Sequence, residues 1–198
     1  MKHKKKNRKS KSKEDGKKPK KKRAPAQGPF LVYAIFHTGQ KDRCYIGQTN
    51  NFERRIKQHN KQISGGARYT SMVAKDSPGR WIPIYHVTGF QMLRSVLQFE
   101  LACKRRKVPV AFVPGRGMVG RGQNTKKAYT RGPRGKVRQL EWLLSLERIT
   151  DEPHSHFASN GIAVQVFLTR DEYLKFAGMT CEQFDLLRQI QGVPFSFL

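Results

Sequence analysis

Five side chains between Phe30 and Glu100 are of the types that cut phosphodiester bonds. They are Tyr33, Tyr45, Arg55, His59 and Glu100. A phenol or an imidazole can take a proton from water, a guanidinium can stabilise charge on a phosphate, and a carboxylate can bind a divalent metal ion. Each residue alone has an ordinary structural explanation, such as packing of a hairpin tyrosine or a salt bridge from Glu100 to Lys104. As an ordered set in one short stretch, they predict cleavage of a phosphodiester bond.

A hairpin is expected to position the two tyrosines. The apolar run at 30–36 and the short run at 43–46 are separated by turn residues, which is the pattern of two paired strands. Alternation along the first strand places three side chains on one face: Leu31, Tyr33 and Ile35. Gly47 follows the second run, and its backbone freedom is expected to allow a sharp turn there.

A helix is expected to position Arg55 and His59. Asn50 or Asn51 is a suitable N-cap, and Gly65-Gly66 is a suitable end. Between them, four residues form one stripe at helical spacing: Phe52, Ile56, His59 and Ile63. Arg55 and His59 are four residues apart, so they are neighbours on one side of this helix.

A strand around 82–87 and a second helix from about Gln91 to Lys107 complete the expected unit. The spacing of this helix places four residues on one side: Leu93, Val96, Glu100 and Cys103. Glu100 then interrupts an apolar face, and a carboxylate in such a place needs a cation or a metal ion as its partner.

This unit resembles a GIY-YIG nuclease domain. Tyr45-Ile46-Gly47 matches the second signature, whereas Leu31-Val32-Tyr33 matches the first at its tyrosine and has leucine in place of the glycine. Within that family, the unit is most similar to the nuclease subunit of the eukaryotic SLX-type structure-selective endonucleases. The similarity rests on these segments in order: residues 54–60 (Arg-Arg-Ile-Lys-Gln-His-Asn), residues 65–70 (Gly-Gly-Ala-Arg-Tyr-Thr), Trp81, residues 87–90 (Val-Thr-Gly-Phe) and Phe99-Glu100.

The resemblance implies an α+β fold for residues 29–106, in which helices flank a small antiparallel three-stranded sheet. It also implies a metal-dependent DNA endonuclease that acts in repair or recombination. Such an enzyme would be structure-selective, with branched, flap or Holliday-junction-like DNA as its substrate.

The resemblance also implies roles for individual residues. One of the two phenols, Tyr45 before Tyr33, would help to deprotonate the attacking water, and His59 could share that role. A free phenol has a pKa of about 10, so this base needs help from nearby cations. Arg55 would clamp the scissile phosphate. Glu100 would bind one divalent metal ion, Mg²⁺ or Mn²⁺, through its carboxylate and through water.

The charge of the chain indicates a polyanionic partner. The formal net charge is +26 and the pI is about 10.5, which favours DNA as the partner. No apolar run is long enough to span a membrane. Residues 1–28 contain fourteen basic and two acidic residues, a composition that predicts a disordered tail. Residues 19–23 of this tail are typical of a nuclear import signal, so the nucleus or a viral replication compartment is the expected location.

A basic, glycine-rich bridge is expected at 107–135. From Lys104 to Arg138 the chain has twelve basic residues, six glycines and no acidic residue. Such a composition favours contact with the DNA backbone over an ordinary linker. The candidate DNA-binding residues of the bridge and the nuclease unit are Arg43, Arg54, Arg68, Lys104, Arg105, Arg106, Arg116, Arg121, Arg131 and Arg134.

Residues 136–198 are expected to form an extension that contains a helix, a strand and two short helices. The amphipathic run at 137–146 predicts the first helix, and residues 162–168 predict the strand. A capping box opens each short helix and a glycine ends it: Thr169 to Glu172 with Gly178, and Thr180 to Gln183 with Gly192.

Three isolated cysteines cannot build the RING-like zinc domain that follows the nuclease in SLX-type proteins. They are Cys44, Cys103 and Cys181, and they suit a reducing compartment. His154 and His156 with Cys181 are better explained as surface residues than as zinc ligands. Without the usual docking module, the protein is expected to act alone or to use another surface for a scaffold protein or a second copy of itself.

Two other functions remain open at this stage. The first is a sequence-specific GIY-YIG endonuclease of the homing or restriction type, although no zinc finger or convincing helix-turn-helix is present to recognise a sequence. The second is a non-catalytic, basic DNA-binding protein. The polar set from Tyr33 to Glu100 argues against the second, because a scaffold has no need of those groups.

Overall fold

The computed structural model describes residues 29–109, 112–113, 117–118, 127–128, 131–146, 149 and 162–197. The predicted tail at 1–28 lies outside these residues, and so does most of the predicted bridge at 107–135. Arg116, Arg121 and the pair His154 and His156 are also outside them.

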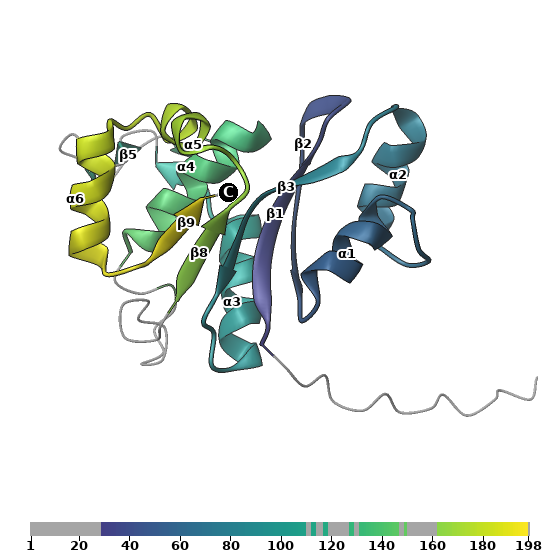
Figure 1. Ribbon diagram of the computed structural model, residues 1–198, viewed down its shortest axis with the longest axis horizontal. Coiled ribbons are helices and arrows are strands. Elements are labelled where there is room, and N and C mark those ends of the chain that lie inside the picture. Colours follow the sequence, from purple (N-terminus) through teal and green to yellow (C-terminus); the bar gives the residue numbers. More distant parts are fainter. Residues whose placement is uncertain are drawn as a thin grey trace, which may run out of the picture.

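A five-stranded sheet in the order β2-β1-β3-β8-β9 forms the centre of the described part of the chain (Figure 1). Its strands are β1 Leu31–His37, β2 Gln40–Thr49, β3 Trp81–Thr88, β8 Ala163–Val166 and β9 Phe195–Phe197. Neighbouring strands are antiparallel except β8 and β9, which are parallel. The predicted α+β class is confirmed, but the sheet has two strands more than predicted, because the C-terminal extension pairs with the free edge of β3.

Alternation along β1 divides the interior into two cores. Val32 and Ala34 face one side of the sheet, and Tyr33 and Ile35 face the other. The second side is covered by α1 Phe52–His59 and α2 Arg68–Asp76 (Figure 1). The first is covered by α3 Leu93–Arg105, α4 Gly132–Leu144, α5 Arg170–Ala177 and α6 Cys181–Gln191. None of the helices in the described ranges is long and apolar enough to cross a membrane.

The helix that carries Arg55 and His59 is shorter than predicted. Asn51 caps its start as expected, since the Asn51 side chain accepts a hydrogen bond from the Arg54 amide at 2.9 Å. The helix ends at His59, and Ile63 is an exposed residue outside it. Asn60 bonds both polar backbone groups of Trp81 on β3, and the following residue has a positive φ, so the chain leaves the helix there. Helix α2, which follows, was missed by the sequence analysis.

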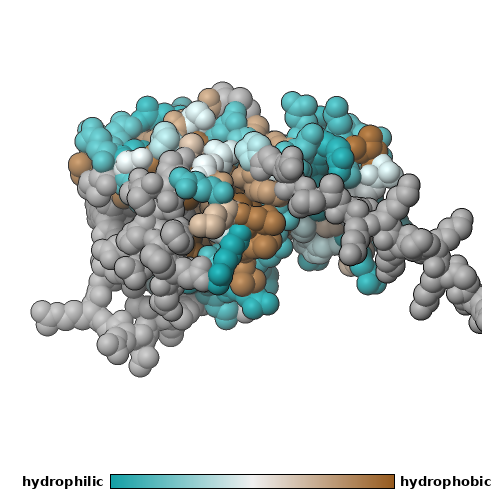
Figure 2. Space-filling model, turned by 90° about the horizontal axis from the view of Figure 1, so that it is seen from below, coloured by the Kyte–Doolittle hydropathy of each residue, from teal (hydrophilic) through white to brown (hydrophobic). Residues whose placement is uncertain are grey.

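The helix that carries Glu100 is turned relative to the prediction. Its buried residues are Val96, Phe99, Ala102 and Cys103, so Glu100 borders the buried face and does not interrupt it. Leu93, which was expected on that face, is 44% exposed. Figure 2 views the molecule from the end at which α3 begins and shows hydrophobic surface near the middle of this view.

The described pieces of the 107–135 bridge contain short paired strands, which the expectation of a loop did not include. β4 Val108–Pro109 pairs with β7 Lys127–Ala128, and β5 Phe112–Val113 pairs with β6 Gly117–Met118. Helix α4 then begins at Gly132, four residues before the predicted extension at 136–198 begins.

The C-terminal helices follow the sequence signals closely. Both capping boxes are present, with Thr169 and Glu172 at the start of α5 and Thr180 and Gln183 at the start of α6. Both helices end in a left-handed glycine, as predicted. Strand β9 was missed, because three residues at a sheet edge give too short a pattern to detect.

A buried charge joins the three C-terminal helices. The Glu141 carboxylate on α4 is fully buried, accepts a hydrogen bond from the Tyr173 hydroxyl on α5 and forms an ion pair with Arg188 on α6. The Arg188 guanidinium also lies 3.9 Å from the ring centroid of Phe195 on β9. Helices α5 and α6 are therefore fixed to α4 by one shared network as well as by apolar packing.

We expect Arg188→Met to lower the free energy of unfolding by about 3–5 kcal/mol, because it leaves the Glu141 carboxylate buried without its cation. Burial raises the pKa of Glu141, and Arg188 opposes that rise. Without Arg188, the folded-state pKa lies further above the unfolded value of about 4.3, so the folded protein takes up the proton first and recovers stability as the pH falls. Urea denaturation should therefore show a larger loss at about pH 8 than at about pH 5.

The control is Asp185→Asn, which breaks the exposed Arg170–Asp185 pair of 2.5 Å. This change should cost at most about 1 kcal/mol, because both side chains are well solvated. Equal losses in the two variants, or a loss in Arg188→Met that does not change with pH, would contradict the role given to the buried network.

Candidate active site

The two signature tyrosines lie on neighbouring strands, and Gly47 makes room for both. Gly47 is paired with Tyr33 across β1 and β2. A Cβ at Gly47 would lie 2.6 Å from the Tyr33 hydroxyl and 2.8 Å from Cε1 of Tyr45. The predicted turn at Gly47 is wrong, because β2 continues to Thr49. Glycine is needed here because any side chain would displace the phenols.

A chain of buried hydrogen bonds joins β1, α1 and α2. The Arg55 Nε donates to the Tyr33 hydroxyl at 3.1 Å, and that hydroxyl lies 2.7 Å from Nε2 of His59. The His59 Nδ1 lies 2.8 Å from the Thr70 hydroxyl. Tyr33, His59 and Thr70 are all fully buried. Arg55 is half-buried and is the end of the chain that reaches the surface.

The position of each proton in these hydrogen bonds follows from the Thr70 hydroxyl. The Thr70 hydroxyl has one hydrogen, and it donates to the Ala67 carbonyl at 2.9 Å. It must therefore accept from Nδ1–H of His59, so Nε2 carries a lone pair and accepts from the Tyr33 hydroxyl. The Tyr33 oxygen keeps an acceptor site for Arg55. All the bonds run in one direction, from the guanidinium to the Ala67 carbonyl.

Burial keeps the inner part of the chain uncharged. Burial, with the nearby charges of Arg55 and Lys61, lowers the pKa of His59 to about 4. Burial raises the pKa of the Tyr33 hydroxyl well above its ordinary value, against the opposing effect of Arg55. Partial burial alone would lower the pKa of Arg55, but the Tyr33 and Tyr45 hydroxyls raise it. Near neutral pH, Arg55 is therefore a fixed cation beside a neutral phenol and a neutral imidazole.

The second tyrosine, Tyr45, faces the outer side of this chain of hydrogen bonds. The Tyr45 ring centroid lies 5.0 Å from that of His59 and 6.3 Å from that of Tyr33. Tyr45 is half-buried, whereas Tyr33 is fully buried. Of the two phenols, Tyr45 is therefore the one that water can approach.

Glu100 reaches the same region from the opposite face of the sheet. Its carboxylate forms a 2.7 Å ion pair with Lys104, one turn further along α3. The Lys104 ammonium in turn lies 5.9 Å from the centroid of the Tyr45 ring. Glu100 also contributes to the electrostatic field at the Tyr33 hydroxyl. The five predicted catalytic residues thus converge on one region, and the salt bridge considered for Glu100 is present as well.

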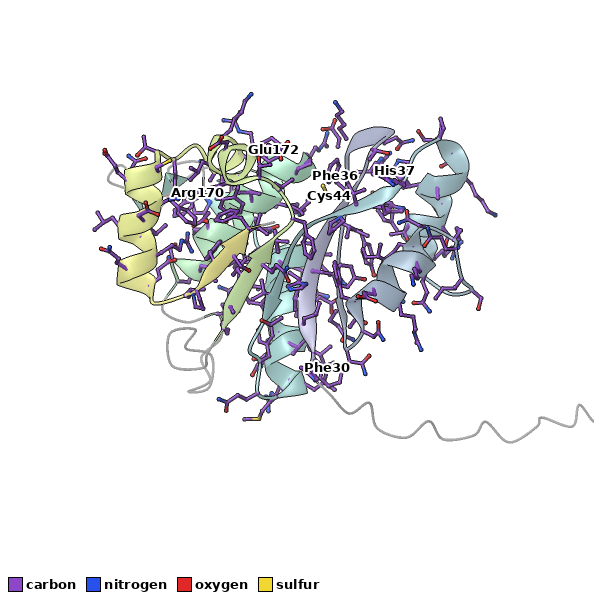
Figure 3. The ribbon with its side chains drawn as sticks, viewed as in Figure 1. Phe30, Phe36, His37, Cys44, Arg170 and Glu172 are labelled. Atoms are coloured by element: carbon purple, nitrogen blue, oxygen red, sulfur yellow. The ribbon has the colours of Figure 1, made fainter. Side chains whose placement is uncertain are left out.

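A small cavity opens beside this region. It has a volume of about 250 Å³ and is lined by Phe30, Gln48, Thr49, Asn50, Asn51, Arg54, Arg55 and Gln58. Phe30 marks the end of the sheet at which the cavity lies, opposite to Phe36 and His37 (Figure 3). Two larger cavities within the described ranges lie between α1 and β3 and against α6, and neither tyrosine lines them.

The candidate DNA-binding residues lie in different settings. Arg54 lines the small cavity, and Lys104 is paired with Glu100. Arg106 donates to the Ile149 carbonyl, a structural contact within the protein. The remaining described candidates are exposed: Arg43 on β2, Arg68 at the start of α2, Arg105 at the end of α3, and Arg131 and Arg134 at the start of α4.

The donor set fits a magnesium ion better than a zinc ion. No group of three or more His, Cys, Asp or Glu side chains able to hold a metal occurs in the part of the chain that the structure describes. Glu100 provides one carboxylate, which already holds a cation, the Lys104 ammonium. Mg²⁺ typically uses one or two carboxylates and completes its shell with water and substrate phosphates, so a single carboxylate at the rim of the site fits it.

Comparison with known families gives this arrangement its class. Residues 29–110 match the family model described as the GIY-YIG catalytic domain.

Three matched relatives share a segment of 76 to 78 residues with this chain. The chain is 43% identical over 76 residues to a Giardia intestinalis protein named structure-specific endonuclease subunit SLX1 homolog, a match that covers 37% of this chain and 20% of the relative. It is 38% identical over 78 residues to the Aspergillus niger structure-specific endonuclease subunit slx1, which covers 39% and 18%. An uncharacterised mimivirus protein, L300, is 36% identical over 77 residues, which covers 38% and 43%. The chain thus spans about a fifth of the length of the two named subunits.

Sequence reasoning missed two residues that shape this site. Thr70 was noted only as part of a similar segment, yet its hydroxyl fixes the orientation and proton of His59. Its signal was the Ala67-to-Thr70 spacing, which allows a threonine to bond a carbonyl three residues earlier and so face inward. The steric role of Gly47 was hidden because a glycine in a strand also predicts a turn or a bulge.

We expect His59 to be neutral at pH 7, with its proton on Nδ1, and to titrate only as the pH approaches 4. Long-range ¹H–¹⁵N NMR correlations of the imidazole measure both properties. In the Thr70→Val variant, Nδ1–H loses its acceptor, and the tautomer should shift toward Nε2–H. A protonated His59 at pH 6, or a wild-type ring with its proton on Nε2, would contradict the direction of the chain.

Proposed function

We propose that this chain is a metal-dependent endonuclease that hydrolyses phosphodiester bonds in DNA. The observation that carries the proposal is the one-way hydrogen-bond chain that holds Arg55 in place, with Tyr45 and Glu100 on its open side. A protein that used this fold only to bind DNA would need the surface charges, but it would not need a buried and fully satisfied network behind one arginine.

Arg55 is the phosphate clamp in this proposal. Its Nε is occupied by Tyr33 and its Nη1 by Gln58 at 3.0 Å, so the guanidinium is fixed in plane. The remaining N–H groups can meet a phosphate oxygen in the neighbouring small cavity. A cation that is held before the substrate arrives stabilises charge in the transition state without the cost of reorganisation.

Tyr45 is the group that takes the proton from the attacking water. It is the more accessible of the two phenols, and the cationic groups of Arg55 and Lys104 lie near it. Tyr33 has a different part, because its hydroxyl already donates to His59 and holds Arg55. His59, which is fully buried, acts only through Tyr33.

Glu100 would hold the divalent metal, Mg²⁺ or Mn²⁺, through its carboxylate. Such an ion would polarise a phosphate and stabilise a leaving oxygen. Lys104 must release Glu100 for this to happen, and its exposed side chain is free to move to a neighbouring DNA phosphate.

The relatives and the charge support a proposal for the substrate and the setting. Two relatives are named as subunits of structure-specific endonucleases, which supports branched DNA as the substrate, a role in repair or recombination, and a partner subunit. The basic candidates on β2, α2, α3 and α4 support backbone contact without sequence selectivity. A nuclear location, or the replication compartment of a virus, agrees with these features.

We expect the purified chain to nick flap or four-way-junction DNA in the presence of Mg²⁺. Glu100→Gln should reduce the rate at least about a hundredfold, because it removes the metal ligand, and should still bind DNA in mobility-shift assays. Glu53→Gln, which removes an exposed carboxylate from α1, is the matched control and should cleave at the wild-type rate. If wild type and Glu100→Gln are equally inert on duplex, flap, bubble and four-way substrates, the proposal is wrong.

Measurements of stability and cleavage rate should distinguish the roles of the two tyrosines. Tyr33→Phe leaves Arg55 Nε and His59 Nε2 without their buried partner, so it should lower both the unfolding free energy, by about 1–3 kcal/mol, and the rate. Tyr45→Phe should lower the rate by about 10²–10⁴-fold, with a small effect on stability. A rate loss of this size in Tyr33→Phe, with Tyr45→Phe at the wild-type rate, would make Tyr33 the base.

A further inference from the structure

An apolar stripe lies exposed on the helix that carries Glu100. Leu93, Leu97 and Leu101 follow one another at intervals of four residues along α3 and are 44%, 45% and 45% exposed. Met92, just before the helix, is 47% exposed. The hydrophobic surface near the middle of the view in Figure 2 lies at the end of the molecule at which α3 begins. Scattered exposed leucines are ordinary, but a continuous stripe of them usually marks a contact surface.

The stripe lies between the proposed metal ligand and a basic edge. At about 100° per residue, the three leucines occupy a sector of about 80° on the helix surface. Glu100 borders one side of that sector, about 20° away, and Arg94 and Arg105 border the other side. Lys104 lies in line with the stripe, less than one turn beyond Leu101. The leucines are thus enclosed by groups that suit a metal ion and phosphates.

Three kinds of occupant can be compared on charge and composition. A second copy of this chain would bring two such basic borders together in a protein of net charge +26, which is unfavourable. Residues 1–28 contain no large apolar residue after Met1 to cover leucines. Nucleic acid meets both needs, since its phosphates suit the basic border and the faces of its bases suit the apolar stripe.

We propose that the leucine stripe of α3 packs against the bases exposed at the branch point of a DNA substrate. In a continuous duplex the base faces are stacked on one another, and only phosphates, sugars and groove edges are available. A branch, a flap or an unpaired end exposes base faces, and leucine or methionine side chains can insert at such steps. The stripe would then select branched DNA within one helical turn of Glu100.

This inference rests on the proposed function and deepens it, because it gives a physical reason for structure selectivity. The same surface could not read a sequence, since aliphatic contact with a base face does not distinguish one base from another. It predicts that selectivity and cleavage depend on different residues of the same helix.

The test uses the full chain and a three-way junction with 2-aminopurine next to the branch, in EDTA, so that binding is measured without cleavage. We expect saturating wild-type protein to raise the fluorescence, because the base leaves its stack. The rise in fluorescence should be about tenfold smaller with the Leu97→Asn/Leu101→Asn variant. It should keep its wild-type size with Leu97→Met/Leu101→Met, which keeps apolar side chains. Leu186→Asn on α6 removes a leucine that is 58% exposed and is the matched control.

Cleavage with Mg²⁺ gives a second and independent result. The ratio of branched-substrate to linear-duplex cleavage should fall about tenfold in the Asn variant and stay at the wild-type value in Leu186→Asn. An unchanged fluorescence response in the Asn variant, or an equal loss in Leu186→Asn, would overturn the inference. A change of oligomeric state in sedimentation with normal fluorescence would assign the stripe to a second copy instead. Loss of cleavage in wild type with the fluorescence pattern intact would overturn the proposed function alone.

Discussion

The hydrogen bond from the Tyr33 hydroxyl to Nε2 of His59 is the interaction on which the site depends. It joins the first strand to the end of α1 in the interior, where an unpaired phenol or imidazole would be costly. The bond forms only because Thr70 on α2 keeps the His59 proton on the other nitrogen and because Gly47 leaves space for the phenol. Four elements must therefore be correctly packed before Arg55 can be held in place.

The C-terminal extension supports this arrangement through the sheet. β8 pairs with β3, whose His86 lies opposite Tyr33 on β1. On the face that carries the site, the rings of Phe52 on α1, His86 on β3 and Phe167 after β8 have centroids 5.2 to 5.3 Å apart. The start of α1 thus packs against residues from both halves of the chain. Residues 162–197 therefore share one sheet and one aromatic contact with the part of the chain that carries the candidate site.

The sequence was informative where a local pattern decides the structure. Strand alternation placed Tyr33 and Ile35 on one face, and the two capping boxes fixed the starts of α5 and α6. It failed where tertiary contacts decide. The early end of α1 comes from bonds between Asn60 and Trp81, twenty-one residues apart, and the exposure of Leu93 depends on how α3 lies on the sheet. Spacing placed Arg55 and His59 on one side of a helix, but the convergence of Glu100 with them came from the family resemblance, because spacing alone cannot bring helices from opposite faces together.

The large positive charge of the chain explains affinity for nucleic acid more easily than selectivity for branched DNA. A net charge of +26 attracts any stretch of nucleic acid, and contacts to phosphates are the same on linear and branched DNA. In the proposed nuclease, discrimination between branched and linear DNA would have to come from short-range groups near the scissile phosphate, where the shape of the substrate differs. In the described residues, α3 combines such groups: a carboxylate at the border of its buried face, a row of leucines next to it and cations beyond. In the proposed mechanism, with the leucines facing the branch, the scissile phosphate would meet Glu100 only when the branch is in place, and a single helix would couple recognition to chemistry.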